Sequence, residues 1–202
     1  MRKDKEMGLV MCQNKEQPFK FNQKKAIQAV AFLLKQNHDT NYSDNYMRLL
    51  KLLYFADRKS LEETGKPITG DRFVALPHGP TLSTLLDLVK QEGFKNDEWN
   101  KYIQKDGYNI RMVNDPGNDE LCHYEMELLN KIWQQYRENG EWAVAIESEK
   151  LPEFKQNHPG ESSKPIPLSD VLKALGKAAW LDDILNAAEE SAEIDRILGM
   201  NH

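Results

Sequence analysis

The stretch that decides the fold is residues 45–88, NYMRLLKLLYFADRKSLEETGKPITGDRFVALPHGPTLSTLLDL. Its first part, Asn45 to about Thr64, is apolar around most of a helical circumference, with charged residues on one strip. A helix of this kind is normally buried against several neighbours. Ser43 or Asp44 is expected to cap it, and Gly65 favours the left-handed conformation that ends a helix. The sequence therefore predicts a central helix on which the core is built.

The second part of the stretch changes character. Arg72–Leu76 is short and bounded by turn residues, which predicts a brief extended segment. His78-Gly79-Pro80 then turns the chain, because Gly79 tolerates unusual torsions and Pro80 can occupy the first turn of a helix. We expect that helix to run from Thr81 to about Gln91.

Outside this stretch the pattern is mostly helical, and we expect a mostly α (α+β) fold. The predicted form is a compact helical domain around the central helix, with a small antiparallel sheet or hairpin, covering residues 19–200 after a loose leader, 1–18. The further expected elements are a helix at Phe21–Gln36 capped by Asn22, a hairpin around Asp106-Gly107, a helix at Asp119–Tyr136, a shorter helix carrying Trp142 to Ile146, a turn at Leu151–Phe154, a loop at His158–Pro165, a short helix at Leu168–Leu175, and a C-terminal helix from Leu181 in two parts around Glu190-Ser191.

Composition limits the class of protein. The chain has 202 residues, 40% of them hydrophobic and 29% charged, which suits one soluble domain. It has no apolar run of the ~18 residues that a membrane-spanning helix needs and no signal-peptide pattern, so we expect a cytoplasmic protein. A net charge of −5 argues against a nucleic-acid partner, because such domains carry a clustered basic face.

The sequence predicts no catalytic residue, cofactor or metal site. It lacks a phosphate-binding loop, a dinucleotide-binding fingerprint and a His-Glu-x-x-His helix. Cys12 and Cys122 are not part of a CxxC pair and are expected to stay reduced. His78 could be a general base or a partner anchor, but the favoured interpretation is that it fixes the turn by bonding a backbone group. Asp57-Arg58 is expected to be a surface ion pair.

Three elements of the stretch resemble the Panacea domain, the SocA-like antitoxin domain that is often seen in phage-associated proteins. They stand in the order and at the distances typical of that family: Leu49–Asp57 (LLKLLYFAD), Thr64–Asp71 (TGKPITGD) and Leu76–Pro80 (LPHGP). The resemblance continues more weakly over Phe21–Gly199. In one subgroup a later stretch reads Thr-His before Pro-Glu-Trp, whereas this chain has Ser148-Glu149 and then Phe154 at those positions.

The resemblance implies a non-catalytic, antitoxin-type role. Such proteins neutralise a cognate toxin by direct binding, and the SocA type delivers it as an adaptor to an ATP-dependent protease. A partner is expected to dock around the extended segment and the turn, for which the candidate residues are Arg72, Phe73, Val74, His78, Gly79 and Pro80. Phe73 and Val74 could offer a strand edge for β-augmentation, but the favoured interpretation of each is ordinary packing in a small sheet.

Two other functions stay open at this point. One is a DNA-binding regulator of the chain's own operon, and the other is an enzyme of unrecognised type. The sequence leaves open the identity of the toxin and whether the chain forms a homo-oligomer.

Overall fold

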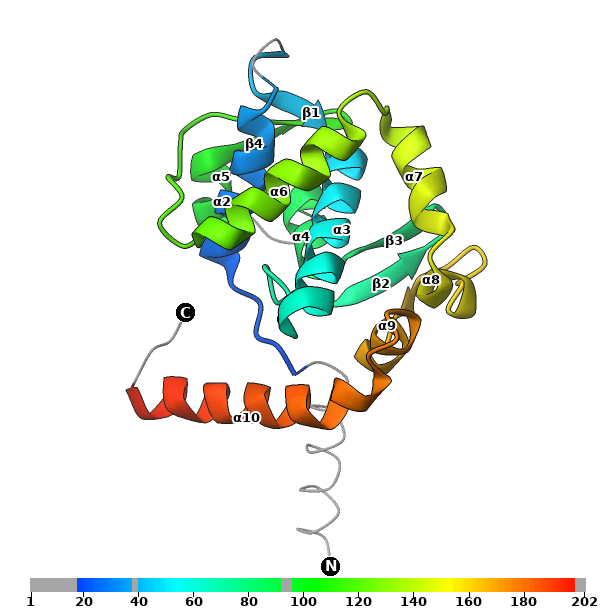
Figure 1. The fold of residues 1–202 in the computed structure, drawn as a ribbon. Coiled ribbons are helices and arrows are strands. Elements are labelled where there is room, and N and C mark those ends of the chain that lie inside the picture. Colours follow the sequence, from blue (N-terminus) through cyan, green and yellow to red (C-terminus); the bar gives the residue numbers. More distant parts are fainter. Residues whose placement is uncertain (1–17, 38–39, 92–95, 199–202) are drawn as a thin grey trace, which may run out of the picture.

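Helix α3, Tyr46–Thr64, runs through the middle of the molecule, and the other elements pack around it (Figure 1). The computed structural model describes residues 18–198 apart from 38–39 and 92–95. Most of α3 is buried, including the fully enclosed side chains of Leu49, Leu52 and Tyr54. The predicted central helix is therefore confirmed. The predicted leader, residues 1–18, lies outside the described residues except for Pro18. Cys12 also lies outside them.

Different features fix the two ends of α3: a side-chain cap at its start and a left-handed glycine at its end. Asn45, not Ser43 or Asp44, caps its start, because the Asn45 side-chain oxygen accepts from the backbone N–H of Met47 at 2.9 Å. Asp44 instead pairs with Arg48. Gly65 ends the helix with a φ of +76°, as its left-handed tolerance predicted.

Helices make up most of the fold, which confirms the predicted class. Asn22 caps the first described helix as predicted, because its side chain accepts from the N–H of Lys25 at 2.9 Å. Besides α3, the described helices are α2 (Gln23–Lys35), which Asn22 caps, α4 (Ser83–Lys90), α5 (Asp97–Tyr102), α6 (His123–Tyr136), α7 (Glu141–Glu149), α8 (Pro152–Gln156), α9 (Leu168–Ala174), η2 (Ala178–Trp180) and α10 (Leu181–Leu198). The predicted break in the last of these is absent, since α10 runs through Glu190 and Ser191.

The described residues also form two three-stranded antiparallel sheets. The first has the order β1-β5-β4, and its β4–β5 hairpin turns at Gly107, which has a φ of +61°, as the Asp-Gly pair predicted. The second has the order β3-β2-β6 and lies beside α3 and α7 (Figure 1). The strand bounds are β1 (Ser43–Asn45), β2 (Phe73–Leu76), β3 (Gly79–Leu82), β4 (Ile103–Asp106), β5 (Asn109–Met112) and β6 (Lys164–Pro165).

The prediction that Pro80 opens a helix is wrong. The turn leads into β3, in which Pro80 and Thr81 pair with β2, and α4 begins only at Ser83. The start of α4 is fixed from a distance. The carboxylate of Asp71 accepts from the N–H groups of Thr84 at 3.0 Å and Leu85 at 2.9 Å, which replaces a local cap.

The predicted start of α6 at Asp119 is also wrong. Cys122 and Glu125 form a capping box at the real start, with the N–H of Cys122 donating to the Glu125 carboxylate at 2.9 Å. Asp119 is used elsewhere, because the side chains of Gln28 and Lys24 on α2 donate to it. Its charge thus ties α2 to the segment that precedes α6 instead of opening a helix.

Helix α10 lies across the end of the body, beyond the last turn of α3 (Figure 1). Ile184 and Ala188 of its first half are buried, whereas Ile194 and Ile197 of its second half are 55% and 72% exposed. Among the described residues, no helix has the length and apolar character required to cross a bilayer.

Candidate functional site

The side chain of Lys51 reaches from α3 to the turn between β2 and β3. Its Nζ donates to the carbonyl oxygen of Pro80 at 3.0 Å, and Lys51 is only 5% exposed. Burial disfavours the ammonium form and lowers the pKa of Lys51 to about 8, although the charge of Glu149 opposes this shift. A buried lysine therefore joins the stretch LLKLLYFAD to the stretch LPHGP.

Gly79 is the point of closest approach between that turn and α7. It has a φ of +94°, and a Cβ placed on it would lie 2.2 Å from Ser148 Oγ and 3.0 Å from Lys51 Nζ. The Ser148 hydroxyl is itself held, because it donates to the carbonyl oxygen of Ala145 at 2.7 Å. Only glycine fits at this position. The turn, α3 and α7 thus form one closely packed unit.

The expected surface ion pair of Asp57 with Arg58 is wrong. Asp57 is fully buried and accepts from the N–H groups of Ile68 at 2.9 Å and Thr69 at 3.0 Å, and also from the Thr69 hydroxyl. Burial raises the pKa of Asp57 to about 7, although these hydrogen bonds oppose the shift. Asp57 therefore holds the stretch TGKPITGD against α3.

Arg58 pairs with a different carboxylate, that of Glu153 at the start of α8. Arg58 Nε donates to Glu153 Oε1 at 2.6 Å, and the hydroxyl of Tyr54 donates to the same oxygen at 3.1 Å. Glu153 is fully buried. Since the charge is both paired and hydrogen-bonded, its burial is tolerated.

The stretches joined by these contacts coincide with a family match. Residues 49–153, just over half of the chain, match the family described as antitoxin SocA-like, Panacea domain. The chain belongs to this family. Comparisons with curated proteins and with solved structures gave no match.

In this Panacea domain the buried polar contacts that join these stretches are structural. Lys51, Asp57, Gly79 and Glu153 are all buried, and each joins α3 to a segment distant in sequence or supports such a junction. A surface that recognises a partner must therefore consist of other, exposed residues.

The exposed residues nearest to this framework form an apolar patch on the turn and α7. The ring of His78 meets the ring of Trp142 edge to face, with 5.5 Å between the ring centroids. Trp142 is 59% exposed, and Ile146, one helical turn further along α7, is 55% exposed. We call His78, Trp142 and Ile146 the turn patch. The expected bond from His78 to a backbone group is absent among the described residues, so the ring contact takes its place.

Sequence reasoning did not single out Trp142 and Ile146 as exposed. The signal was present in the spacing of α7, since the buried residues Val144, Ala145 and Ser148 mark its inner face. Residues 142 and 146 lie four apart on the opposite side of the helix.

The predicted candidate residues do not form one site. His78 belongs to the turn patch, while Gly79 and Pro80 are buried beside Lys51. Arg72 and Phe73 lie at the other end of the β2–β3 hairpin, about 10 Å along the strand. The structure thus separates the predicted site into the hairpin's turn and its base.

Phe73 and Val74 pack within a small sheet, as the favoured interpretation predicted, and they offer no free edge because β2 is the central strand. Val74 pairs with Thr81 on one side and with Pro165 on the other. The carbonyl oxygen of Phe73 accepts from the N–H of Ile166 at 2.9 Å. The stretch predicted as loop around Pro165 supplies β6, which occupies the edge that a partner would need.

A pocket of about 440 Å³ lies at the base of the hairpin, between β2, β6 and the start of α9. We call it the base pocket. It is lined by Pro18, Phe19, Asp71, Arg72, Phe73, Asn157, Lys164, Pro165, Ile166, Pro167 and Leu168. Its size falls within the range of ordinary ligand sites.

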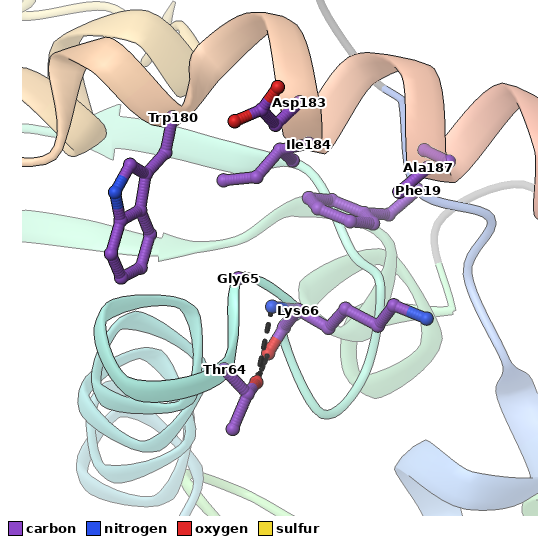
Figure 2. Close-up of a pocket in the computed structure, with 9 residues that line it drawn as sticks. Phe19, Thr64, Gly65, Lys66, Trp180, Asp183, Ile184 and Ala187 are labelled. Atoms are coloured by element: carbon purple, nitrogen blue, oxygen red, sulfur yellow. Dashed lines mark hydrogen bonds between the residues drawn. The ribbon is translucent and has the colours of Figure 1, made fainter.

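A smaller pocket of about 220 Å³ separates α10 from the end of α3 (Figure 2). Figure 2 shows Phe19 and Ile184 directed into the space between the helix and the Thr64–Lys66 corner. A Cβ on Gly65 would meet Ile184 at 3.5 Å, an ordinary van der Waals distance. This pocket is the seam by which α10 attaches to the body.

The described residues form no metal centre. They contain no group of three or more His, Cys, Asp or Glu side chains placed to hold an ion. Cys122 is a free, exposed cysteine at the start of α6.

Proposed function

We propose that this Panacea-domain protein neutralises a cognate toxin by binding it directly, without catalysing a reaction, and that the turn patch makes the central contact. The observation that carries the proposal is the exposed indole of Trp142 packed on His78. Tryptophan is among the residues that most often dominate the binding energy of protein interfaces.

The patch suits this role because its backbone is held from beneath. Lys51 fixes the turn through Pro80, and the close contact of Gly79 with Ser148 fixes the turn against α7. A surface held in this way loses little conformational freedom when a partner binds. Exposed apolar side chains that lie together on a rigid support are typical of interaction sites.

The test is co-expression with the product of a neighbouring gene that is toxic when expressed alone. We expect the unmodified chain to restore growth and to copurify with the toxin. Trp142→Ala and Ile146→Ala should weaken both effects while leaving the melting temperature within a few degrees. The matched control is Trp180→Ala, because Trp180 is also a partly exposed tryptophan, at 38%, but lies beside α10.

Two outcomes would contradict the proposal. Failure of the unmodified chain to rescue growth or to bind the toxin would remove the antitoxin role. Full rescue by the Trp142→Ala, Ile146→Ala double variant would keep the role but remove the turn patch from it. Measuring the lifetime of the toxin, with and without the cell's ATP-dependent proteases, would separate simple neutralisation from adaptor-mediated degradation.

A further inference from the structure

The base pocket combines apolar walls with two cations that have no partner of their own. Arg72 and Lys164 are exposed and line the pocket, and neither forms an ion pair with any residue that the structure describes. Phe73, Ile166 and Leu168 contribute apolar surface to the same pocket. The chain as a whole is acidic, with a net charge of −5, whereas this apolar pocket is flanked by two unpaired cations. It fits a ligand with an apolar body and a negative group.

The one carboxylate among the residues that line the pocket forms no ion pair with these cations. Asp71 is 5% exposed, and its oxygens accept from the N–H groups of Arg72 at 2.6 Å, Thr84 at 3.0 Å and Leu85 at 2.9 Å. These bonds commit Asp71 to the start of α4. The guanidinium of Arg72 and the ammonium of Lys164 remain available to an incoming anion.

Several backbone positions around the pocket have no N–H group that is free to bind an anion. Pro165 and Pro167 carry no N–H, and those of Arg72 and Ile166 already donate to Asp71 and to Phe73. Phosphate sites usually depend on several free backbone N–H groups. Recognition here would come from the two side-chain cations, which suits a carboxylate.

Asn157 is a buried amide that also lines the pocket. It is only 4% exposed, and its amide nitrogen donates to the carbonyl oxygen of Glu153 at 3.1 Å and to Asp170 Oδ2 at 2.8 Å. These two bonds fix the orientation of the side chain. Asn157 Oδ1 accepts no hydrogen bond from any described residue, so it can accept one from a ligand N–H.

We propose that the base pocket binds the C-terminal end of a partner polypeptide whose last residue is apolar. The free carboxylate lies between Arg72 and Lys164, the last side chain enters the pocket, and the last N–H donates to Asn157 Oδ1. This inference goes beyond the proposed function, because it requires a polypeptide partner but no contact at the turn patch. The two proposals therefore stand or fall separately.

The probe is the dipeptide N-acetyl-Phe-Leu with a free carboxylate, titrated into the full chain by calorimetry. We expect binding, and at least about tenfold weaker binding of the same dipeptide with a C-terminal amide. The ester analogue, in which oxygen replaces the last N–H, should also bind more weakly because it cannot donate to Asn157. Equal binding of the acid and the amide, or no binding of the acid at about 1 mM, would overturn the inference. Binding of 4-methylpentanoate as tight as that of the dipeptide would also overturn it, because the site would then recognise a small acid.

Variants identify the site. Arg72→Gln and Lys164→Gln should each weaken binding of the free-acid dipeptide several-fold to about tenfold, without changing the weak binding of the amide. The matched control, Lys105→Gln, removes the same charge from the other sheet and should leave the affinity unchanged. If Lys105→Gln weakened binding as much as Arg72→Gln, the effect would reflect overall charge and the assignment to this pocket would fail. Thermal unfolding of each variant, compared with that of the unmodified chain, checks that the fold is retained.

Discussion

Lys51 Nζ lies 3.0 Å from the carbonyl oxygen of Pro80, so a buried lysine on the central helix holds the β2–β3 turn in place. The lysine belongs to the first signature element of the family and the proline to the third. Their contact joins two stretches of the chain that lie 29 residues apart. It also places the turn patch on a rigid base.

Gly79→Ala should destabilise the protein by about 2–4 kcal/mol, because the new Cβ would collide with Ser148 Oγ and adopt a strained φ. Gly160→Ala is the matched control, with a φ of +65° and nothing within 4 Å of the added Cβ. It should cost only about 1 kcal/mol. Denaturant unfolding measures both. Adding Ser148→Ala to Gly79→Ala should recover part of the loss, and equal costs for the two glycine variants would contradict the steric explanation.

Lys51→Met should remove a pH dependence of stability on the alkaline side. The pKa of Lys51 is lowered to about 8 from its usual 10.5, so the folded state binds fewer protons than the unfolded state between these values. Stability therefore rises with pH between about 8 and 10.5, by up to about 3 kcal/mol. Urea unfolding across this range should show the rise in the unmodified chain and a smaller one in the variant. The same rise in both would show that Lys51 is not its source.

Asp57→Asn should remove a dependence of opposite sign at lower pH. The pKa of Asp57 is raised to about 7 from 3.8, so the folded state holds a proton that the unfolded state has lost. The contribution of this group is complete below about pH 4 and is lost as pH rises to about 7. Asparagine can still accept from Ile68 and Thr69 and can donate to the Thr69 hydroxyl. The variant should therefore be at least as stable at pH 7 and show a smaller slope below it, and marked destabilisation at pH 7 would refute this account.

Arg58→Met should destabilise the fold by about 2–3 kcal/mol, because it leaves the fully buried carboxylate of Glu153 without a cation. Adding Glu153→Gln removes that charge. We expect the double variant to be more stable than Arg58→Met alone, as a double-mutant cycle by chemical denaturation would show. If the two costs simply add, the pair is not coupled.

The parts of the fold that could be predicted from the sequence depend on local patterns. The helix at Tyr46–Thr64 and the hairpin at Gly107 follow from apolar spacing and turn residues a few positions apart. The polar contacts could not be predicted in this way, because Lys51 meets Pro80 across 29 residues and Tyr54 meets Glu153 across 99. Asp57 had the pattern of a surface residue and is buried only because the segment around Thr69 folds over it.

The same reason explains how the predicted site differed from the observed surface. A short extended segment suggests a free edge until its neighbours are known, and the partner of β2 on that side comes from Lys164 and Pro165, some ninety positions later. Arg72 was predicted as part of the extended segment, and only the fold brings Lys164 and Asn157 to line the same pocket.

The two-residue strand β6 also limits where the chain can be shortened. It lies after Glu153, outside the family-matched residues, yet it covers β2 at Val74 and Ala75. A fragment ending at residue 153 would leave these backbone groups bare, and an uncovered strand of this kind can recruit the same strand of another molecule. We therefore expect a fragment that ends at residue 153 to aggregate more readily than the full chain.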